Sequence, residues 1–272
     1  MTNERFQELV NESFAALEGN SVHLPGENTD IPVLEAPLTG IASADDPLFE
    51  AFRAPEVIGA EWRSPREWMP EAKSAAAFFF PFREEVRVRA ARETELTCEA
   101  WNVAYGGNFK LVDAFLDILV PRLEAEGVKV FQPNRDPGLK RQPVTVLSGG
   151  EEDVHYSVSW SNRHVCFAAG LGTFGVHRHL ITEKGCCGTL ASFLMDAELT
   201  PTPRSYTDPY EYCIRCGACA DRCPAGAITL EHLRNLKKCA AQGGVVRERF
   251  GSGFCGKCLT GIPCEDKNPS RE

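Results

Sequence analysis

The sequence has no long hydrophobic run and no excess of basic residues. Its most apolar stretch, residues 75–82, is far too short to span a bilayer and contains Pro81. Residues 1–6 show no apolar segment of the kind found in secretory signals. Lys and Arg number 29 against 38 Asp and Glu, and the resulting net charge of −9 disfavours a broad nucleic-acid or anionic-membrane surface. These absences predict a cytoplasmic protein with no membrane partner.

Signs of disorder are also lacking. Charged residues make up 25% and aromatic residues 9% of the 272 positions, which are ordinary values for globular proteins. The sequence contains no internal repeat and no low-complexity tract. Its length therefore predicts one large domain or two unequal ones, with a sizeable core.

Cysteine, by contrast, is abundant, with twelve residues. In a reducing compartment so many cysteines favour metal or redox chemistry over a disulfide framework. Eight of them lie between residues 213 and 264. We expect the other four to be bystanders packed in the rest of the chain: Cys98, Cys166, Cys186 and Cys187.

This change in composition marks a second domain. Its boundary lies near residues 201–204, Pro-Thr-Pro-Arg, which is typical of a linker or turn. From residue 204 onward eleven Lys and Arg stand against eight Asp and Glu, so this part carries +3 and the rest −12. We predict an acidic body over residues 1–203 and a cysteine-rich domain over residues 204–272.

Hydrophobic periodicity predicts an α+β body. Residues 20–72 have little periodicity and predict a long wrapping segment with short helices. The helices are expected over 6–17, over 93–126 with a break at Gly106-Gly107, and over 161–169. The strands are expected over 74–80, 128–131, 144–147, 154–160, 180–182 and 189–194.

The cysteine-rich domain opens with the run Cys213-x2-Cys216-x2-Cys219-x3-Cys223-Pro224. This is the spacing of bacterial ferredoxins, in which three thiolates wrap one 4Fe-4S cluster and the fourth ligates another. Structural zinc is the alternative, but zinc prefers paired C-x2-C knuckles. The run therefore predicts iron–sulfur chemistry.

The remaining cysteines complete a second ligand set. Cys239 lies at the end of a helix predicted over 231–241, and a later C-x2-C-x5-C group follows it. Eight thiolates match two 4Fe-4S clusters with none left over. Crossed ligation predicts Cys213, Cys216, Cys219 and Cys264 on one cluster, and Cys223, Cys239, Cys255 and Cys258 on the other. The alternative for Cys239 is a small buried residue of its helix.

Three features resemble the epoxyqueuosine reductase-like family of iron–sulfur proteins, which is related to corrinoid-dependent reductive dehalogenases. Residues 72–82 resemble its early core strand, and residues 162–175 resemble its signature E-R-x-x-A-x-x-A-G-L-G-W-x-G. The order of the cysteines is the third feature. The resemblance implies a nitroreductase-like α+β body that holds cobalamin beside a ferredoxin-like two-cluster domain. Electrons would then pass from cluster to cluster to cobalt.

The sequence departs from the family pattern in ways that affect function. Three signature positions differ, since Asn162, Cys166 and Thr173 replace Glu, Ala and Trp. Tyr156 occupies the position of the family's proton-donating Asp, so its phenol is the candidate catalytic group, with packing as its alternative role. Asp153 lies close by in the sequence. The helical-repeat extension that epoxyqueuosine reductases use on tRNA does not follow Cys264, and the body is acidic, so tRNA is not an expected partner.

A glycine-rich loop follows the predicted helix over 161–169. Gly170, Gly172 and Gly175 match G-x-G-x-x-G, but a dinucleotide site needs a strand before this motif and a helix after it. We expect these glycines to let the backbone approach a flat cofactor, or to form a turn. His177 comes next and is the candidate to meet the cofactor, with solvent exposure as the alternative.

Together these observations predict an iron–sulfur oxidoreductase with two 4Fe-4S clusters. A ferredoxin- or flavodoxin-type donor would reduce the clusters, which would pass electrons to a second cofactor in residues 1–203 for reduction of a small substrate. Cobalamin is the cofactor that the resemblance implies, and flavin is the alternative. A non-enzymatic electron-transfer protein that serves a partner is the other candidate function.

Overall fold

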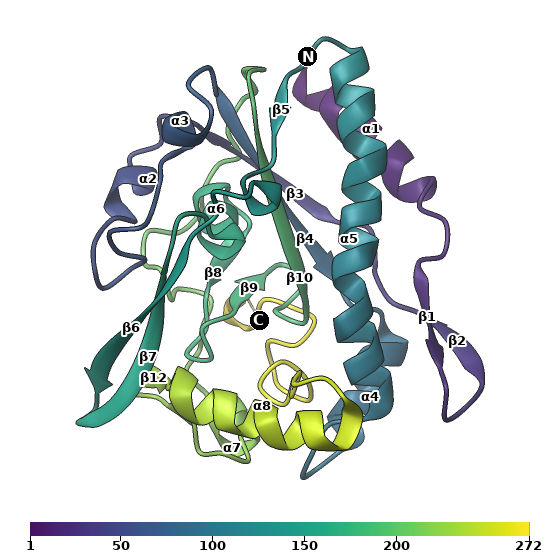
Figure 1. Cartoon of the computed structure of the whole chain (residues 1–272), viewed down its shortest axis with the longest axis vertical. Helices are drawn as coiled ribbons and strands as arrows, with labels where there is room; N and C mark the ends of the chain where they lie inside the picture. The colour runs from purple at the N-terminus through teal and green to yellow at the C-terminus, as the bar shows by residue number, and fades with distance from the viewer. Residues whose placement is uncertain (272) are drawn as a thin grey trace.

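The body is built around one antiparallel sheet with the strand order β3-β4-β10-β5, seen in the computed structural model of Figure 1. The structure describes residues 1–271. The sheet consists of β3 (Leu38–Ser43), β4 (Ser74–Pro81), β5 (Val130–Phe131) and β10 (Gly188–Met195). β4 pairs with β10 along its full length, from Ser74 opposite Met195 to Pro81 opposite Gly188. Segments far apart in the sequence are thereby fixed side by side.

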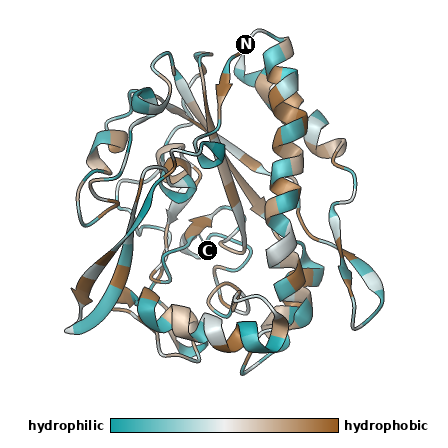
Figure 2. Ribbon diagram, in the orientation of Figure 1, coloured by the Kyte–Doolittle hydropathy of each residue, from teal (hydrophilic) through white to brown (hydrophobic). Residues whose placement is uncertain are grey.

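All eight residues of β4 are buried because helices cover both faces of the sheet. On one face lie α1 (Asn3–Ala15) and α5 (Glu99–Ala125), and the ring of Phe78 packs 6.4 Å from Phe6 and 5.7 Å from Phe115. On the other face α6 (Asn162–Ala168) packs against β4 and β10. Figure 2 shows hydrophobic and hydrophilic residues interleaved along α5, as expected for a helix with one face on the core.

Most predicted elements of the body are confirmed, with shifted ends. The strands over 74–80 and 189–194 are β4 and β10, and the strand over 180–182 is β9 (Leu180–Thr182), which pairs with β8 (Gly172–Phe174). The two strands predicted over 144–147 and 154–160 form the hairpin β6 (Arg141–Ser148) and β7 (Glu151–Val158), outside the main sheet. Of the strand predicted over 128–131, only residues 130–131 form a strand, β5.

Two predictions for the body are wrong. The break expected at Gly106-Gly107 is absent, because α5 includes both glycines. A separate helix, α4 (Glu84–Arg92), precedes α5. Gly107 instead leaves room for a neighbouring hairpin, since a Cβ there would lie 2.7 Å from Val22 Cγ1. The segment over 20–72 contains strands as well as short helices: β1 (Ser21–Leu24), β2 (Thr29–Pro32), β3, α2 (Leu48–Ala51) and α3 (Pro65–Trp68).

The cysteine-rich part has little regular structure apart from one helix, α8 (Leu236–Phe250). Its other elements are short: α7 (Ala218–Asp221), β11 (Ile228–Thr229), β12 (Leu233–Arg234) and a 3-10 helix (Pro269–Arg271). The body contains a similar 3-10 helix (Pro133–Arg135). The helix predicted over 231–241 starts later, because Asn235 caps it by accepting from the Lys238 N–H at 2.9 Å. The carboxylate of Asp153 also accepts from the Leu236 N–H at 2.6 Å.

The cysteine-rich part packs closely on the body. The Tyr206 hydroxyl donates to the Phe167 carbonyl at 2.6 Å, and the Cys186 N–H donates to the Cys264 carbonyl at 2.8 Å. The division at residues 203 and 204 stays a prediction, as does the cellular location. Within residues 1–271, the helices are too short or too polar for any of them to span a membrane.

The core around β4 gives a stability prediction. We expect Phe78→Ala to lower the free energy of unfolding by about 3–5 kcal/mol, because the Phe78 side chain is fully buried among Phe6, Phe115 and Phe193. Urea denaturation followed by tryptophan fluorescence measures the change. Leu147 is 79% exposed, so the control Leu147→Ala is expected to change stability by less than about 0.5 kcal/mol. Equal losses in the two variants would contradict the assignment of the core.

Candidate functional site

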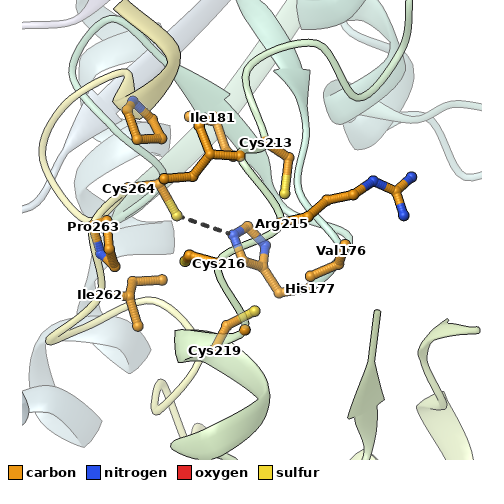
Figure 3. A pocket seen from close by; sticks show the side chains of 13 residues that line it. Val176, His177, Ile181, Cys213, Arg215, Cys216, Cys219, Ile262, Pro263 and Cys264 are labelled. Atoms are coloured by element: carbon orange, nitrogen blue, oxygen red, sulfur yellow. Dashed lines mark hydrogen bonds between the residues drawn. The ribbon is translucent and has the colours of Figure 1, made fainter. Parts of the chain in front are cut away.

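The four cysteines predicted for the first cluster line one cavity (Figure 3). Cys213, Cys216 and Cys219 come from the loop before α7 and from α7 itself, and Cys264 comes from the loop after α8. Gly217 turns the loop with φ of +83°, a conformation that glycine adopts without steric cost. The structure therefore gathers the predicted first set, which we call the first quartet.

The other four cysteines also lie close together. Burial raises the pKa of Cys255, and repulsion from Cys239 and Cys223 adds to the shift. Burial likewise raises the pKa of Cys258 to about 12, with further repulsion from the same thiols. Cys239, on α8, is therefore near its predicted partners. We call Cys223, Cys239, Cys255 and Cys258 the second quartet; whether each quartet binds a cluster stays a prediction.

The spread of the sulfur atoms disfavours zinc. Tetrahedral zinc with Zn–S bonds of about 2.3 Å holds its sulfur ligands roughly 3.8 Å apart. Within residues 1–271, one group of three His, Cys, Asp or Glu ligand atoms lies within 4.8 Å, formed by His177, Cys186 and Cys264. Neither quartet is gathered so tightly. Two all-cysteine sets match 4Fe-4S clusters, which are held by four thiolates.

The Cys264 sulfur makes two side-chain hydrogen bonds with the body. Nδ1 of His177 accepts from the His179 N–H at 3.0 Å, so the ring proton lies on Nε2, which is 3.5 Å from Cys264 Sγ. Figure 3 shows this contact as a dashed line. Cys186 Sγ lies 3.9 Å from the same sulfur. The hydrogen bond with Cys186 chiefly lowers the pKa of Cys264, to about 5, and the His177 ring lowers it further.

The backbone holds these donors in place. The Cys186 and Cys187 N–H groups donate to the carbonyls of Cys264 at 2.8 Å and Glu265 at 3.0 Å. A Cβ at Gly185 would lie 2.3 Å from the Glu265 carbonyl oxygen, so only glycine permits this close approach. The Glu265 carboxylate in turn pairs with Arg87 at 2.8 Å, and both side chains are nearly buried.

Two sequence-based interpretations of this region change. His177 is 1% exposed, so the solvent-exposed alternative is wrong, and the ring meets a predicted cluster ligand. Cys186, expected to be a bystander, contacts the same ligand. Nothing in the local sequence indicates this role, because Cys186 and Cys264 are 78 positions apart.

The three loop glycines are explained by contacts within the chain. A Cβ at Gly172 would lie 1.9 Å from the Ile181 carbonyl oxygen, and one at Gly175 would lie 2.6 Å from the His177 ring. Gly170 has φ of +79° and faces Thr202. The motif runs from helix α6 into strand β8, the reverse of a dinucleotide site. Their predicted approach to a cofactor stays untested.

Tyr156 lies on β7 and is 40% exposed, with the Arg141 guanidinium 3.9 Å above its ring. Asp153 is fully buried and holds the start of α8, so it has a structural role. His155, which the sequence does not single out, accepts from Arg178 Nη1 at 2.8 Å through Nε2. The catalytic role of Tyr156 stays a prediction.

A group of half-buried polar side chains of the body lies near Cys258 of the second quartet, and we call this region the recess. Tyr105 of α5, Arg163 of α6 and His179 are partly exposed, yet burial is the main cause of each pKa shift. It raises the pKa of Tyr105, lowers that of Arg163 to about 10, and lowers that of His179 well below its usual value. The thiol of Cys258 acts on Tyr105. The second quartet therefore adjoins half-buried polar side chains of the body.

Comparison with known proteins supports the iron–sulfur interpretation. Residues 207–229 match the family model of a 4Fe-4S binding domain. No curated protein sequence matches the chain.

Similar folds occur among solved structures. Epoxyqueuosine reductase from Bacillus subtilis has a TM-score of 0.52 and 17% identity, covering 96% of this chain and 65% of its own. The enzyme from Streptococcus thermophilus has a TM-score of 0.55 and 13% identity, covering 98% and 68%. A catabolic reductive dehalogenase has a TM-score of 0.56 and 13% identity, covering 98% of this chain and 38% of its own.

The chain thus spans about two thirds of the length of these epoxyqueuosine reductases and less of the dehalogenase. The resemblance predicted from the sequence is confirmed in the fold. The protein has the α+β fold of epoxyqueuosine reductases and reductive dehalogenases, with a 4Fe-4S binding domain at residues 207–229.

Proposed function

We propose that the protein is an iron–sulfur reductase whose two 4Fe-4S clusters deliver electrons to a corrinoid that reduces a small substrate. The observation that carries this proposal is the line formed by the first quartet, the second quartet and the recess. Burial raises the pKa of Cys219 in the first quartet to about 12, and Cys258 of the second quartet adds to this shift. This interaction indicates that the two cysteines are close. Cys258 in turn adjoins Tyr105 at the recess.

The first quartet is the proposed entry point for electrons. Cys216 is exposed and its neighbour Ile214 is 49% exposed, so a ferredoxin- or flavodoxin-type donor can reach a cluster bound there. The second quartet is the proposed exit, because it faces the body. An electron carrier alone needs the quartets but not the polar side chains that the body gathers beside the second one.

The recess suits a corrinoid because it offers buried polar groups with unused hydrogen-bonding capacity. Arg234 is 8% exposed, and its Nε has no partner among residues 1–271. A bound corrinoid supplies a cobalt centre that takes up electrons and carries out the reductive chemistry. One dehalogenase of similar fold is described as carrying out B12-dependent dehalogenation.

Tyr156 is the proposed proton donor. Arg141 stacks on its ring, and the same guanidinium is close enough to Arg163 to contribute to lowering the pKa of Arg163. The Arg141 guanidinium thus links the phenol to the neighbourhood of Arg163, which supports this role. We propose a small substrate and not tRNA, although one similar epoxyqueuosine reductase was solved with a tRNA stem loop, because the body carries −12.

Metal content tests the two-cluster part of the proposal. We expect anaerobically purified or reconstituted protein to contain about eight irons per chain, with matching sulfide. Cys239→Ala is expected to lower the iron content toward about four, because it removes one ligand of the second quartet. Cys166→Ala is the matched control, since Cys166 is buried in α6 away from both quartets, and it is expected to keep the full iron content.

Fewer than about six irons in the unaltered chain, or stoichiometric zinc, would contradict the two-cluster assignment. The corrinoid is tested separately by adding cobalamin, desalting and measuring cobalt. Failure to retain cobalt would remove the corrinoid. Flavin released on denaturation would then support a flavin-dependent reductase, and the lack of any organic cofactor would support an electron-transfer protein.

The hydrogen bonds to Cys264 give a prediction about redox potential. Donors to a cluster thiolate stabilise the reduced, more negative cluster more than the oxidised one. We expect His177→Phe to lower the midpoint potential of the first cluster by roughly 30–60 mV, measured by a redox titration monitored by electron paramagnetic resonance. His23→Phe, at an exposed histidine paired with Asp30, is the control and leaves the potential unchanged. A potential that His177→Phe leaves unchanged would mean that this contact does not act on a cluster.

A further inference from the structure

Three arginines from separate elements come together at the recess: Arg163 of α6, Arg178 of the turn after β8, and Arg234 of β12. Arg163 Nη1 donates to the Arg178 carbonyl at 2.5 Å, Arg178 Nη1 to His155 Nε2 at 2.8 Å, and Arg234 Nη1 to His179 Nε2 at 2.7 Å. Burial and the neighbouring guanidiniums lower the pKa of both histidines, so both are neutral. Each arginine thus donates to an uncharged acceptor.

Negative charge near these arginines is scarce. In the part of the chain that the structure describes, the one carboxylate paired with any of them belongs to Asp153, whose Oδ2 is 4.0 Å from Arg178 Nη2. Oδ1 of the same carboxylate already accepts from two backbone N–H groups at the start of α8. Arg163 and Arg234 therefore have no carboxylate partner.

Burial makes this excess of positive charge unfavourable unless an anion offsets it. Arg234 is more than nine-tenths buried and its Nε is unpartnered within residues 1–271. Burial lowers the pKa of Arg163 to about 10, and repulsion from Arg234, Arg178 and Arg141 contributes. In a chain with a net charge of −9, such a concentration of cations indicates a specific role.

Balancing the charge of the second cluster explains only part of this arrangement. Arg234 does act on the thiol of Cys258. The ionised groups that act on Arg163 and Arg178 include other arginines and Asp153, and no cysteine is among the main causes of their pKa shifts. Balancing the charge of the cluster therefore does not by itself account for these two arginines.

The backbone is held in unusual conformations where it presents two of the arginines. Arg178 has φ of +62°, and so does Leu233, the residue before Arg234. Non-glycine residues rarely adopt this left-handed conformation, and folded proteins often retain it at binding sites. The observation supports a site but does not identify its ligand.

We propose that Arg163, Arg178 and Arg234 form a binding site for an oxyanion, a carboxylate or a phosphate, beside the second quartet. This inference rests on the proposed function for its role, which is to hold an anionic group of the substrate next to the reducing centre. Guanidiniums suit this task because they pair with carboxylate and phosphate in bidentate fashion. The phosphate of a corrinoid's nucleotide loop shares this chemistry and is the other source of the anion.

Isothermal titration of the iron-loaded protein with inorganic phosphate and with benzoate at low salt tests the site. We expect saturable binding of at least one of these anions, weakened roughly tenfold or more by Arg178→Gln or by Arg234→Gln, with partial recovery in Arg178→Lys. Arg122→Gln, at an exposed arginine paired with Glu12, is the matched control and leaves binding unchanged. Iron content and the visible spectrum show that each variant is folded.

Lack of binding of both anions up to about 10 mM, or equal binding by unaltered protein and both Gln variants, would overturn the site. If prior loading with cobalamin abolishes phosphate binding while cobinamide, which lacks the phosphate, does not, the corrinoid supplies the anion. If both loaded forms still bind the anion, the substrate supplies it. Low iron content with intact anion binding would contradict the proposed function while leaving this site in place.

Discussion

The contact between Cys264 and residues 177–187 of the body is the interaction on which the arrangement depends. Backbone hydrogen bonds join Cys186 to Cys264 and Cys187 to Glu265, and His177 and Cys186 each contact the Cys264 sulfur. A predicted cluster ligand is thus fixed by the strand that runs into the central sheet. Any metal held by the first quartet would be rigidly placed relative to the body, which efficient electron transfer requires.

Charge is distributed to match this arrangement. The body is acidic overall, yet arginines gather where it adjoins the second quartet. Cations at that position favour negative clusters, anionic ligands and electrons arriving from the first quartet. The same distribution disfavours a large polyanion such as tRNA on the outer surface of the body.

The sequence predicts what depends on local spacing and misses what depends on distant contacts. The cysteine run predicts three ligands because two-residue spacers curl the chain, and the number of cysteines predicts the rest. Strong apolar runs predict β4 and β10. Strand β3 is not predicted, because Gly40 interrupts its short pattern of alternating apolar and polar residues. This glycine makes room for the end of α6. No sequence pattern predicts the contacts of Cys186, Arg178 and Arg234, since their partners lie tens of positions away.

The central claim is that two clusters lie next to each other in one chain and lead to the recess. Electron paramagnetic resonance of the fully reduced anaerobic protein tests it most directly. The account predicts about two unpaired spins per chain, with the broadened spectrum of two neighbouring clusters that interact magnetically. A sharp spectrum from one isolated cluster per chain, or no cluster signal in iron-loaded protein, would contradict it.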